Sequence, residues 1–176
     1  MSLVVFVRGI NVGGHRTFRP AAFAARWRDL DAVNIGAAGT FVIRHPVGAA
    51  WLRAEIRRRL PFVAEVMVCP GREIRRLVAR DFFGGRPARR DLVRFVSVLA
   101  RRPRSAPRLP MALPSRGRWV LQVLAREGRY VVGHHRRRMQ AIGWLGRLDT
   151  LFGAPATTRS WNTMTAIAAA LGNGAA

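Results

Sequence analysis

The chain has 176 residues, is 49% hydrophobic with five Trp, and has a formal net charge of +22 from thirty-one basic and nine acidic residues. This length allows one compact domain or two small packed halves, and the apolar content argues against a disordered chain. No apolar stretch approaches the roughly eighteen residues that a membrane-spanning helix needs, so we expect no membrane partner.

The first seventy residues predict strands that alternate with helices. The apolar, β-branched run 3–7 predicts a buried strand. Pro20 suits a first helical position, and apolar residues at helical spacing predict a helix over 20–30. The other elements expected here are strands at 33–35, 41–43 and 63–68 and helices around 52–60 and 74–78.

The order of these elements is strand, helix, strand, strand, helix, strand. This order is typical of the ferredoxin-like, or βαββαβ, arrangement. We therefore expect an α+β protein whose N-terminal half, residues 1–85, is an antiparallel sheet with helices on one face.

The second half, residues 86–176, predicts a β-rich structure that packs against the first half and ends in a helix. Residues 101–118 contain four Pro, a spacing that forbids a helix or a central strand, so they predict an extended Pro/Arg-rich loop. The remaining expected elements are strands at 92–99, 119–124 and 129–132, a helical stretch near 140–152 and a last helix over 160–171.

Cys69 is the single cysteine, so the chain has no intramolecular disulfide. The start of the chain lacks a basic leader, and its apolar run is too short for a signal peptide. Together these features predict a cytoplasmic protein in a reducing compartment. Cys69 ends an apolar run before Pro70 and has no base coupled to it in the sequence, which predicts a buried, inert thiol.

Three segments together resemble a known bacterial family. They are Arg8-Gly9-Ile10-Asn11-Val12-Gly13-Gly14, the run 34–42, and the run 156–163 before the closing helix. In order and spacing they resemble the domain of unknown function 1697 family over nearly the whole chain. The resemblance implies an α+β protein with ferredoxin-like organisation, and it implies no activity. Many members have a Tyr-Ile-Gln-Ser-Gly-Asn-like second segment, whereas Gly36-Ala37-Ala38-Gly39-Thr40 lacks those polar side chains.

The Gly-rich turn between the first strand and the first helix is a candidate anion site. Such a turn offers backbone N–H groups to an anion, although its spacing matches neither a P-loop nor a dinucleotide fingerprint. The alternative, which we favour, is that these glycines only turn the chain in left-handed conformations. The candidate anion-binding residues are Arg8, Gly9, Asn11, Gly13, Gly14, His15 and Arg16, joined by Arg159 and Asn162 near the last helix.

Residues near the last helix also have a structural interpretation. Thr157, Thr158 and Ser160 precede that helix, and any of the three hydroxyls can cap it. Capping alone explains this segment, which weakens its interpretation as a binding site.

Two Arg triplets are candidate nucleic-acid contacts, because guanidinium groups bind phosphate in a bidentate fashion. A solvated face is the alternative for each. The adjacent His134 and His135 have no third candidate ligand at a sequence spacing typical of metal sites, so we expect no metal site. We expect no cofactor, and no constellation predicts a catalytic residue. The triplets are Arg57, Arg58 and Arg59, and Arg136, Arg137 and Arg138.

The charge balance carries the functional prediction. Every basic residue is Arg, a habit of GC-rich genomes, but exchanging Lys for Arg does not explain why bases outnumber acids. A net +22 on a small surface attracts polyanions. We therefore expect a non-catalytic module that binds the phosphate backbone of RNA or DNA. The alternatives are an enzyme or sensor for a small anionic or phosphorylated ligand at the Gly-rich turn, and a protein that binds an acidic partner protein.

Overall fold

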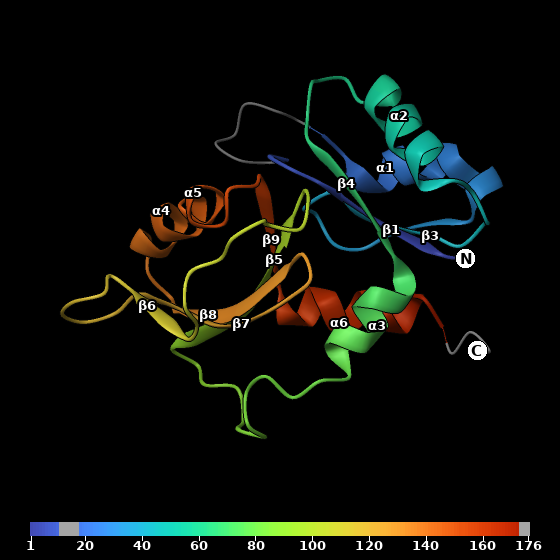
Figure 1. The fold of residues 1–176 in the computed structure, drawn as a ribbon. Helices are drawn as coiled ribbons and strands as arrows, with labels where there is room; N and C mark the ends of the chain where they lie inside the picture. The colour runs from blue at the N-terminus through green and yellow to red at the C-terminus, as the bar shows by residue number, and fades with distance from the viewer. Residues whose placement is uncertain (11–17, 173–176) are drawn as a thin grey trace. The chain divides into compact units, whose positions relative to one another are not determined.

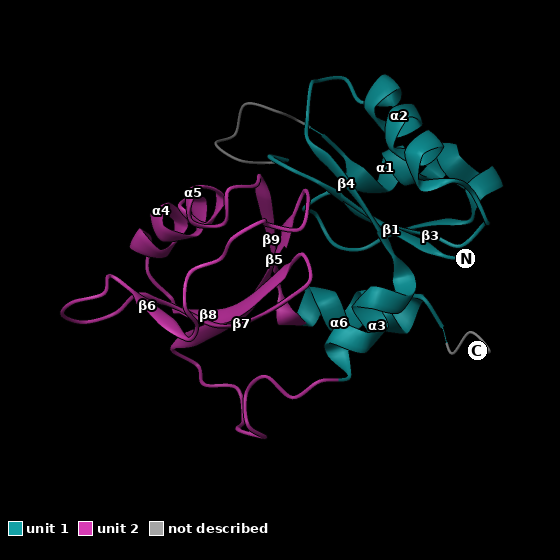
Figure 2. Cartoon of the chain, viewed as in Figure 1, with its two compact units in different colours: residues 1–79, 162–176 teal, residues 80–161 magenta. Residues whose placement is uncertain are grey.

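The computed structural model describes residues 1–10 and 18–172 and divides the chain into two compact units, shown in Figure 2. Unit 1 comprises Met1–Ala79 and Asn162–Ala176, and unit 2 comprises Arg80–Trp161. Each unit has its own antiparallel sheet, so the expected mixed α+β class is confirmed. None of the helices in the described ranges is both long and apolar enough to cross a membrane.

Unit 1 contains a four-stranded sheet in the order β2-β3-β1-β4 (Figure 1). All its pairings are antiparallel, and helices connect β1 to β2 and β3 to β4. This order and connectivity confirm the ferredoxin-like expectation. The strands are β1 (Leu3–Val7), β2 (Ala32–Asn34), β3 (Thr40–Ile43) and β4 (Val66–Pro70).

The first two helices of unit 1 lie on one face of this sheet (Figure 1). Leu3, Val5 and Val7 alternate toward that face and share a core with Leu52 and Ile56. Burial of such side chains stabilises the fold by about 2 kcal/mol each. The helices of the unit are α1 (Pro20–Ala24), followed by a 3-10 helix (Ala25–Leu30), α2 (Ala49–Arg59), α3 (Gly71–Val78) and α6 (Trp161–Ala170), whose first residue belongs to unit 2.

Two predicted boundaries in unit 1 need correction. The helix expected over 20–30 is broken, because the backbone at Trp27 leaves helical values (φ −119°, ψ 37°) while its ring packs into the core 5.7 Å from the ring of Phe23. The strand expected over 63–68 lies later, because β1 pairs with β4 from Val66 to Pro70. Val63 is 96% exposed and precedes the strand.

Unit 2 contains a five-stranded sheet in the order β6-β7-β8-β5-β9. The three predicted strands are present, and β7 and β8 extend beyond their predicted ends. The expected helical stretch forms two short helices, α4 (Gln140–Gly146) and α5 (Leu148–Phe152). The strands are β5 (Leu92–Leu99), β6 (Met111–Leu113), β7 (Leu121–Glu127), β8 (Tyr130–Arg136) and β9 (Ala156–Ser160).

The sequence did not predict β6 and β9, which form the two edges of this sheet. Pro110 and Pro114 flank β6, and Pro is tolerated beside an edge strand because no ladder hydrogen bond is lost. The segment 156–160 was expected to cap a helix, but it pairs with β5. There the hydroxyls of Ser97 and Thr158 lie 2.6 Å apart, so the hydroxyl of Thr158 bonds across the sheet.

The two faces of the second sheet have different character, and this difference positions the candidate site. Phe95, Leu121 and Val123 point to one face and share a core with Leu148 of α5 and partly buried residues of α4. Because strand side chains alternate, their neighbours on the same strands point to the opposite face. These neighbours include Arg94 and Gln122 but also the buried Val96 and Val98, so the opposite face is polar only in the part around Arg94 and Gln122.

The division into units differs from the expected halves 1–85 and 86–176. Residues 80–85 belong to unit 2, and the C-terminal residues from Asn162 onward belong to unit 1. The closing helix returns to the first unit because its end packs there. Arg44, next to β3, donates two hydrogen bonds to the carbonyl of Ala170, at 2.8 and 3.0 Å.

We expect Gly133→Ala to destabilise unit 2 by at least about 2 kcal/mol. A Cβ at Gly133 in β8 would lie 2.1 Å from the carbonyl oxygen of Gln122 and 2.8 Å from the ring of Phe95. The backbone of a paired strand can move away only by breaking its hydrogen bonds, which costs free energy. Urea unfolding measures the loss. The control is Gly143→Ala in α4, where a Cβ meets nothing within 4 Å and should stabilise the helix by about 0.5–1 kcal/mol. Equal effects of the two substitutions would contradict this account of Gly133.

Candidate functional site

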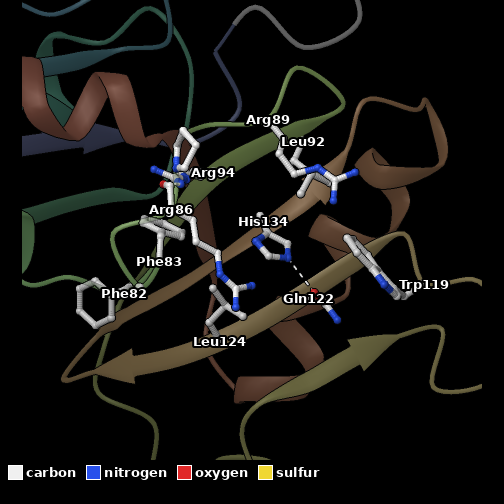
Figure 3. A pocket seen from close by; sticks show the side chains of 12 residues that line it. Phe82, Phe83, Arg86, Arg89, Leu92, Arg94, Trp119, Gln122, Leu124 and His134 are labelled. Atoms are coloured by element: carbon white, nitrogen blue, oxygen red, sulfur yellow. Dashed lines mark hydrogen bonds between the residues drawn. The ribbon is translucent and has the colours of Figure 1, made fainter.

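The polar part of the sheet face opposite α4 and α5 forms the floor of a cleft of about 490 Å³, which lies wholly within unit 2 (Figure 3). The lining comes from strands β5, β7 and β8, from the segment 82–89 and from Trp119, which precedes β7. Every lining residue is at least partly exposed, so the cleft is open to solvent. The lining residues are Phe82, Phe83, Gly84, Arg86, Pro87, Arg89, Leu92, Arg94, Trp119, Gln122, Leu124 and His134.

Strand register brings three polar side chains together on the floor. His134 of β8 pairs with Arg94 of β5 on one side and with Gln122 of β7 on the other. Directly opposed residues in antiparallel strands have their Cβ atoms about 5 Å apart, so their side chains interact. His134 Nε2 lies 2.6 Å from Gln122 Oε1, the bond drawn in Figure 3. Because an amide oxygen can only accept, Nε2 carries the proton and donates it.

The environment favours the neutral form of His134. Partial burial is the largest cause that lowers its pKa from 6.5, and the positive charges of Arg94, Arg89 and Arg136 lower it further. With Nε2–H donated to Gln122, the neutral ring presents Nδ1 as an acceptor. The floor therefore offers one acceptor from His134 beside the amide N–H donors of Gln122.

Aromatic rings hold the arginines around the cleft. The guanidinium of Arg94 lies over the ring of Phe83, 4.3 Å from the centroid. The guanidinium of Arg136 lies over the ring of Trp119 at 4.2 Å, and the His134 ring lies 5.4 Å from the same indole. Such cation–π contacts orient the guanidinium without neutralising it.

The cleft has a positive balance of charge. Arg86, Arg89 and Arg94 line it, and none of its described lining residues is acidic. Arg89 makes a bidentate ion pair with Asp91, with N–O distances of 2.8 and 2.9 Å, and this pair lowers the pKa of the Asp91 carboxyl group. Arg94 is held by a neutral group, the backbone carbonyl of Arg86. Asp81, which accepts from the backbone N–H of Phe83, is a second carboxylate beside the cleft, so three lining guanidinium groups stand against two neighbouring carboxylates.

The Gly-rich turn is described only at its start. Arg8 and Gly9 follow β1 in unit 1, and the backbone N–H of Arg8 donates to the carbonyl of Glu65 at 2.9 Å. Gly9 has φ +75°, the left-handed conformation expected of a glycine that turns the chain. The grouping of these residues stays a prediction. Asn11, Gly13, Gly14, His15 and Arg16 lie outside the described residues.

The two candidate anion contacts near the last helix fall in different units. Arg159 lies on β9 in unit 2 and is only 6% exposed. It donates to the hydroxyl of Thr157 and the carbonyl of Thr158, both at 2.8 Å, and burial lowers its pKa to about 10. It therefore offers little surface to an anion in solution. Asn162 is exposed in the first turn of α6, in unit 1.

The first Arg triplet lies at the end of α2 and is ion-paired. Arg58 and Arg59 both contact Glu55, each at 2.6 Å, and Arg57 contacts Glu65 at 3.1 Å. The hydrogen bond from Arg58 is the main cause that lowers the pKa of Glu55 to about 2. Two carboxylates thus offset much of the charge of this triplet.

The second Arg triplet begins at the last residue of β8, because that strand is longer than predicted. Arg136 is mostly buried, donates to the carbonyl of Trp119 at 3.0 Å and lies 3.5 Å from Asp91. Arg137 donates to the carbonyl of Arg90 at 2.8 Å, and Arg138 is exposed. Of the six predicted contacts, Arg136 is the one that adjoins the cleft, through its contact with Trp119.

Sequence reasoning missed the residues that form the cleft. A weak signal was present, because Arg94 and Gln122 each interrupt an apolar run and therefore point away from its core face. Nothing in the sequence pattern linked them with Arg86 or Trp119, which lie outside the strands. In the described part of the chain, no three His, Cys, Asp or Glu side chains gather as a metal site would require.

Comparisons with protein-family models, with curated proteins and with solved structures found no significant match to this chain. The resemblance to the domain of unknown function 1697 family therefore stays a prediction.

We expect His134 to titrate below pH 6.5 in the folded protein. At pH values between the pKa of His134 in the folded protein and 6.5, the unfolded chain binds more protons than the folded protein. The free energy of unfolding therefore falls as the pH drops through that range. NMR of the imidazole signals reports the pKa directly, and His134→Gln should remove this part of the pH dependence in urea unfolding. An NMR pKa above 6.5 would show that the floor does not hold the ring neutral.

Proposed function

We propose that this protein is a non-catalytic binding module for RNA or DNA, which it holds through phosphate groups in the basic cleft of unit 2. The observation that supports this most directly is the lining itself, with three arginines and no acidic residue among its described members. The surplus of twenty-two positive charges over the whole chain adds long-range attraction for a polyanion.

The way in which the arginines are held favours phosphate binding. Arg94 is oriented by the ring of Phe83 and by the carbonyl of Arg86, so little conformational freedom remains to be lost when it binds. Arg86 itself is exposed at the cleft. A planar guanidinium presents paired N–H donors, which match two oxygens of one phosphate.

The other side chains of the cleft support binding rather than group transfer. Apart from the neutral His134, they are guanidinium, amide, aromatic and aliphatic groups. His134 Nε2–H is engaged with Gln122 at 2.6 Å. Such an environment positions a ligand through hydrogen bonds and ring contacts.

A salt titration of oligonucleotide binding tests this proposal. With about three phosphate contacts, one for each arginine of the cleft, affinity for oligonucleotides of about 15 nucleotides should fall roughly 20- to 40-fold between about 50 and 200 mM salt. Arg86→Ala should reduce the slope of log affinity against log salt by about 0.7–0.9, the value for one lost contact. Fluorescence anisotropy with a labelled oligonucleotide measures both.

The matched control is Arg104→Ala, which removes the same charge from an exposed arginine beyond the opposite end of β5. It should change affinity and slope less than Arg86→Ala. Equal losses would mean that the cleft is not the binding site, and no binding at about 50 mM salt would remove the proposal altogether.

A further inference from the structure

We infer that the cleft selects single-stranded nucleic acid, because it takes one unpaired base beside Trp119 while Arg86 and Arg94 hold the adjoining phosphates. This inference rests on the proposed function and names the form of nucleic acid that the same site takes. Base stacking on aromatic side chains combined with a basic groove is the common means of binding single strands.

Trp119 lies across the floor of the cleft from Arg86 and from Arg94, which stacks on Phe83. In Figure 3, Trp119 lies on one side of the floor, Arg86 and Arg94 lie on the other, and His134 lies between them. A nucleotide has the same division, with a flat base joined to a charged phosphate. The volume of about 490 Å³ falls within the range of sites that hold one small-molecule unit.

The contacts of Trp119 hold its indole ring at the cleft. Arg136 lies over the indole at 4.2 Å but does not line the cleft, whereas Trp119 itself does. The His134 ring also lies 5.4 Å from the indole, but Trp119 remains partly exposed in the lining, so part of its ring surface is open to a ligand. The carbonyl of Trp119 accepts from the side chain of the same arginine at 3.0 Å, so both ring and backbone are fixed before a ligand arrives.

The polar floor matches the edge of a base that has no pairing partner. Gln122 uses its oxygen to accept from His134, which leaves its amide N–H groups as donors. Neutral His134 adds an acceptor at Nδ1 in the neighbouring register position. In a duplex the pairing edge of a base is already occupied and its faces are stacked, so only a single strand can use this floor and Trp119 together.

Three probes of matched length test the inference on the unaltered protein. They are a single-stranded oligonucleotide, a duplex, and a single strand whose bases are replaced by abasic sites. We expect the ordinary single strand to bind at least about tenfold more tightly than the abasic strand, because stacking of each base adds to the affinity. We also expect it to bind more tightly than the duplex at the same salt concentration.

Trp119→Leu should weaken binding of the ordinary single strand at least about fivefold, leave its salt slope unchanged and leave the abasic strand unaffected. Trp119→Phe should restore most of the loss, because it keeps a ring. The matched control is Trp51→Leu in α2, which removes an exposed Trp from unit 1. If Trp119→Leu does not fold, as judged by circular dichroism, the binding of the same three probes to Gln122→Ala is measured instead.

Equal binding of the three probes would overturn the inference and leave the proposed function intact, because phosphates alone would then explain the affinity. Competition by a free mononucleotide as strong as that by the oligonucleotide would also overturn it, since the cleft would then serve a small ligand. Failure of all three probes to bind at about 50 mM salt would instead overturn the proposed function itself.

Discussion

The close pairing of β7, β8 and β5 is the constraint on which the candidate site depends. At Gly133 the backbone of β8 approaches the carbonyl of Gln122 and the ring of Phe95 so closely that no side chain fits. That register fixes which residues point to each face. Hydrophobic residues bury one face against α4 and α5, and the burial holds the sheet rigid. The opposite face then displays His134 in line with Gln122 and Arg94.

The protein holds its arginines in two different ways, and only one of them leaves the positive charge available. At the end of α2, Arg58 and Arg59 share the carboxylate of Glu55, which neutralises much of their charge. Around the cleft, Arg94 lies over the ring of Phe83 and donates to the carbonyl of Arg86, whereas Arg136 combines a ring and a carbonyl contact with an ion pair to Asp91 at 3.5 Å. Rings and carbonyls orient a guanidinium but carry no net charge to cancel it. Arginine suits this arrangement because its planar group stacks on a ring and still donates from its edge.

The cleft also differs from the site that the Gly-rich turn suggested. In that turn, glycines and basic residues occur together over a short run of sequence. The cleft instead combines residues from four separate segments, which include Arg86, Arg94, Trp119 and His134. Its positive balance arises because three guanidinium groups line it, against the two neighbouring carboxylates of Asp81 and Asp91.

The sequence by itself determined the ferredoxin-like half, because apolar periodicity marks buried strands and helices wherever an element has a core face, as in 3–7 and 52–60. It also determined the excess of positive charge. Only the tertiary structure decided the edge strands β6 and β9, since an edge strand is defined by its neighbour rather than by its own pattern. Only the tertiary structure decided the site, because strand register, and not proximity in sequence, places Gln122, His134 and Arg94 side by side.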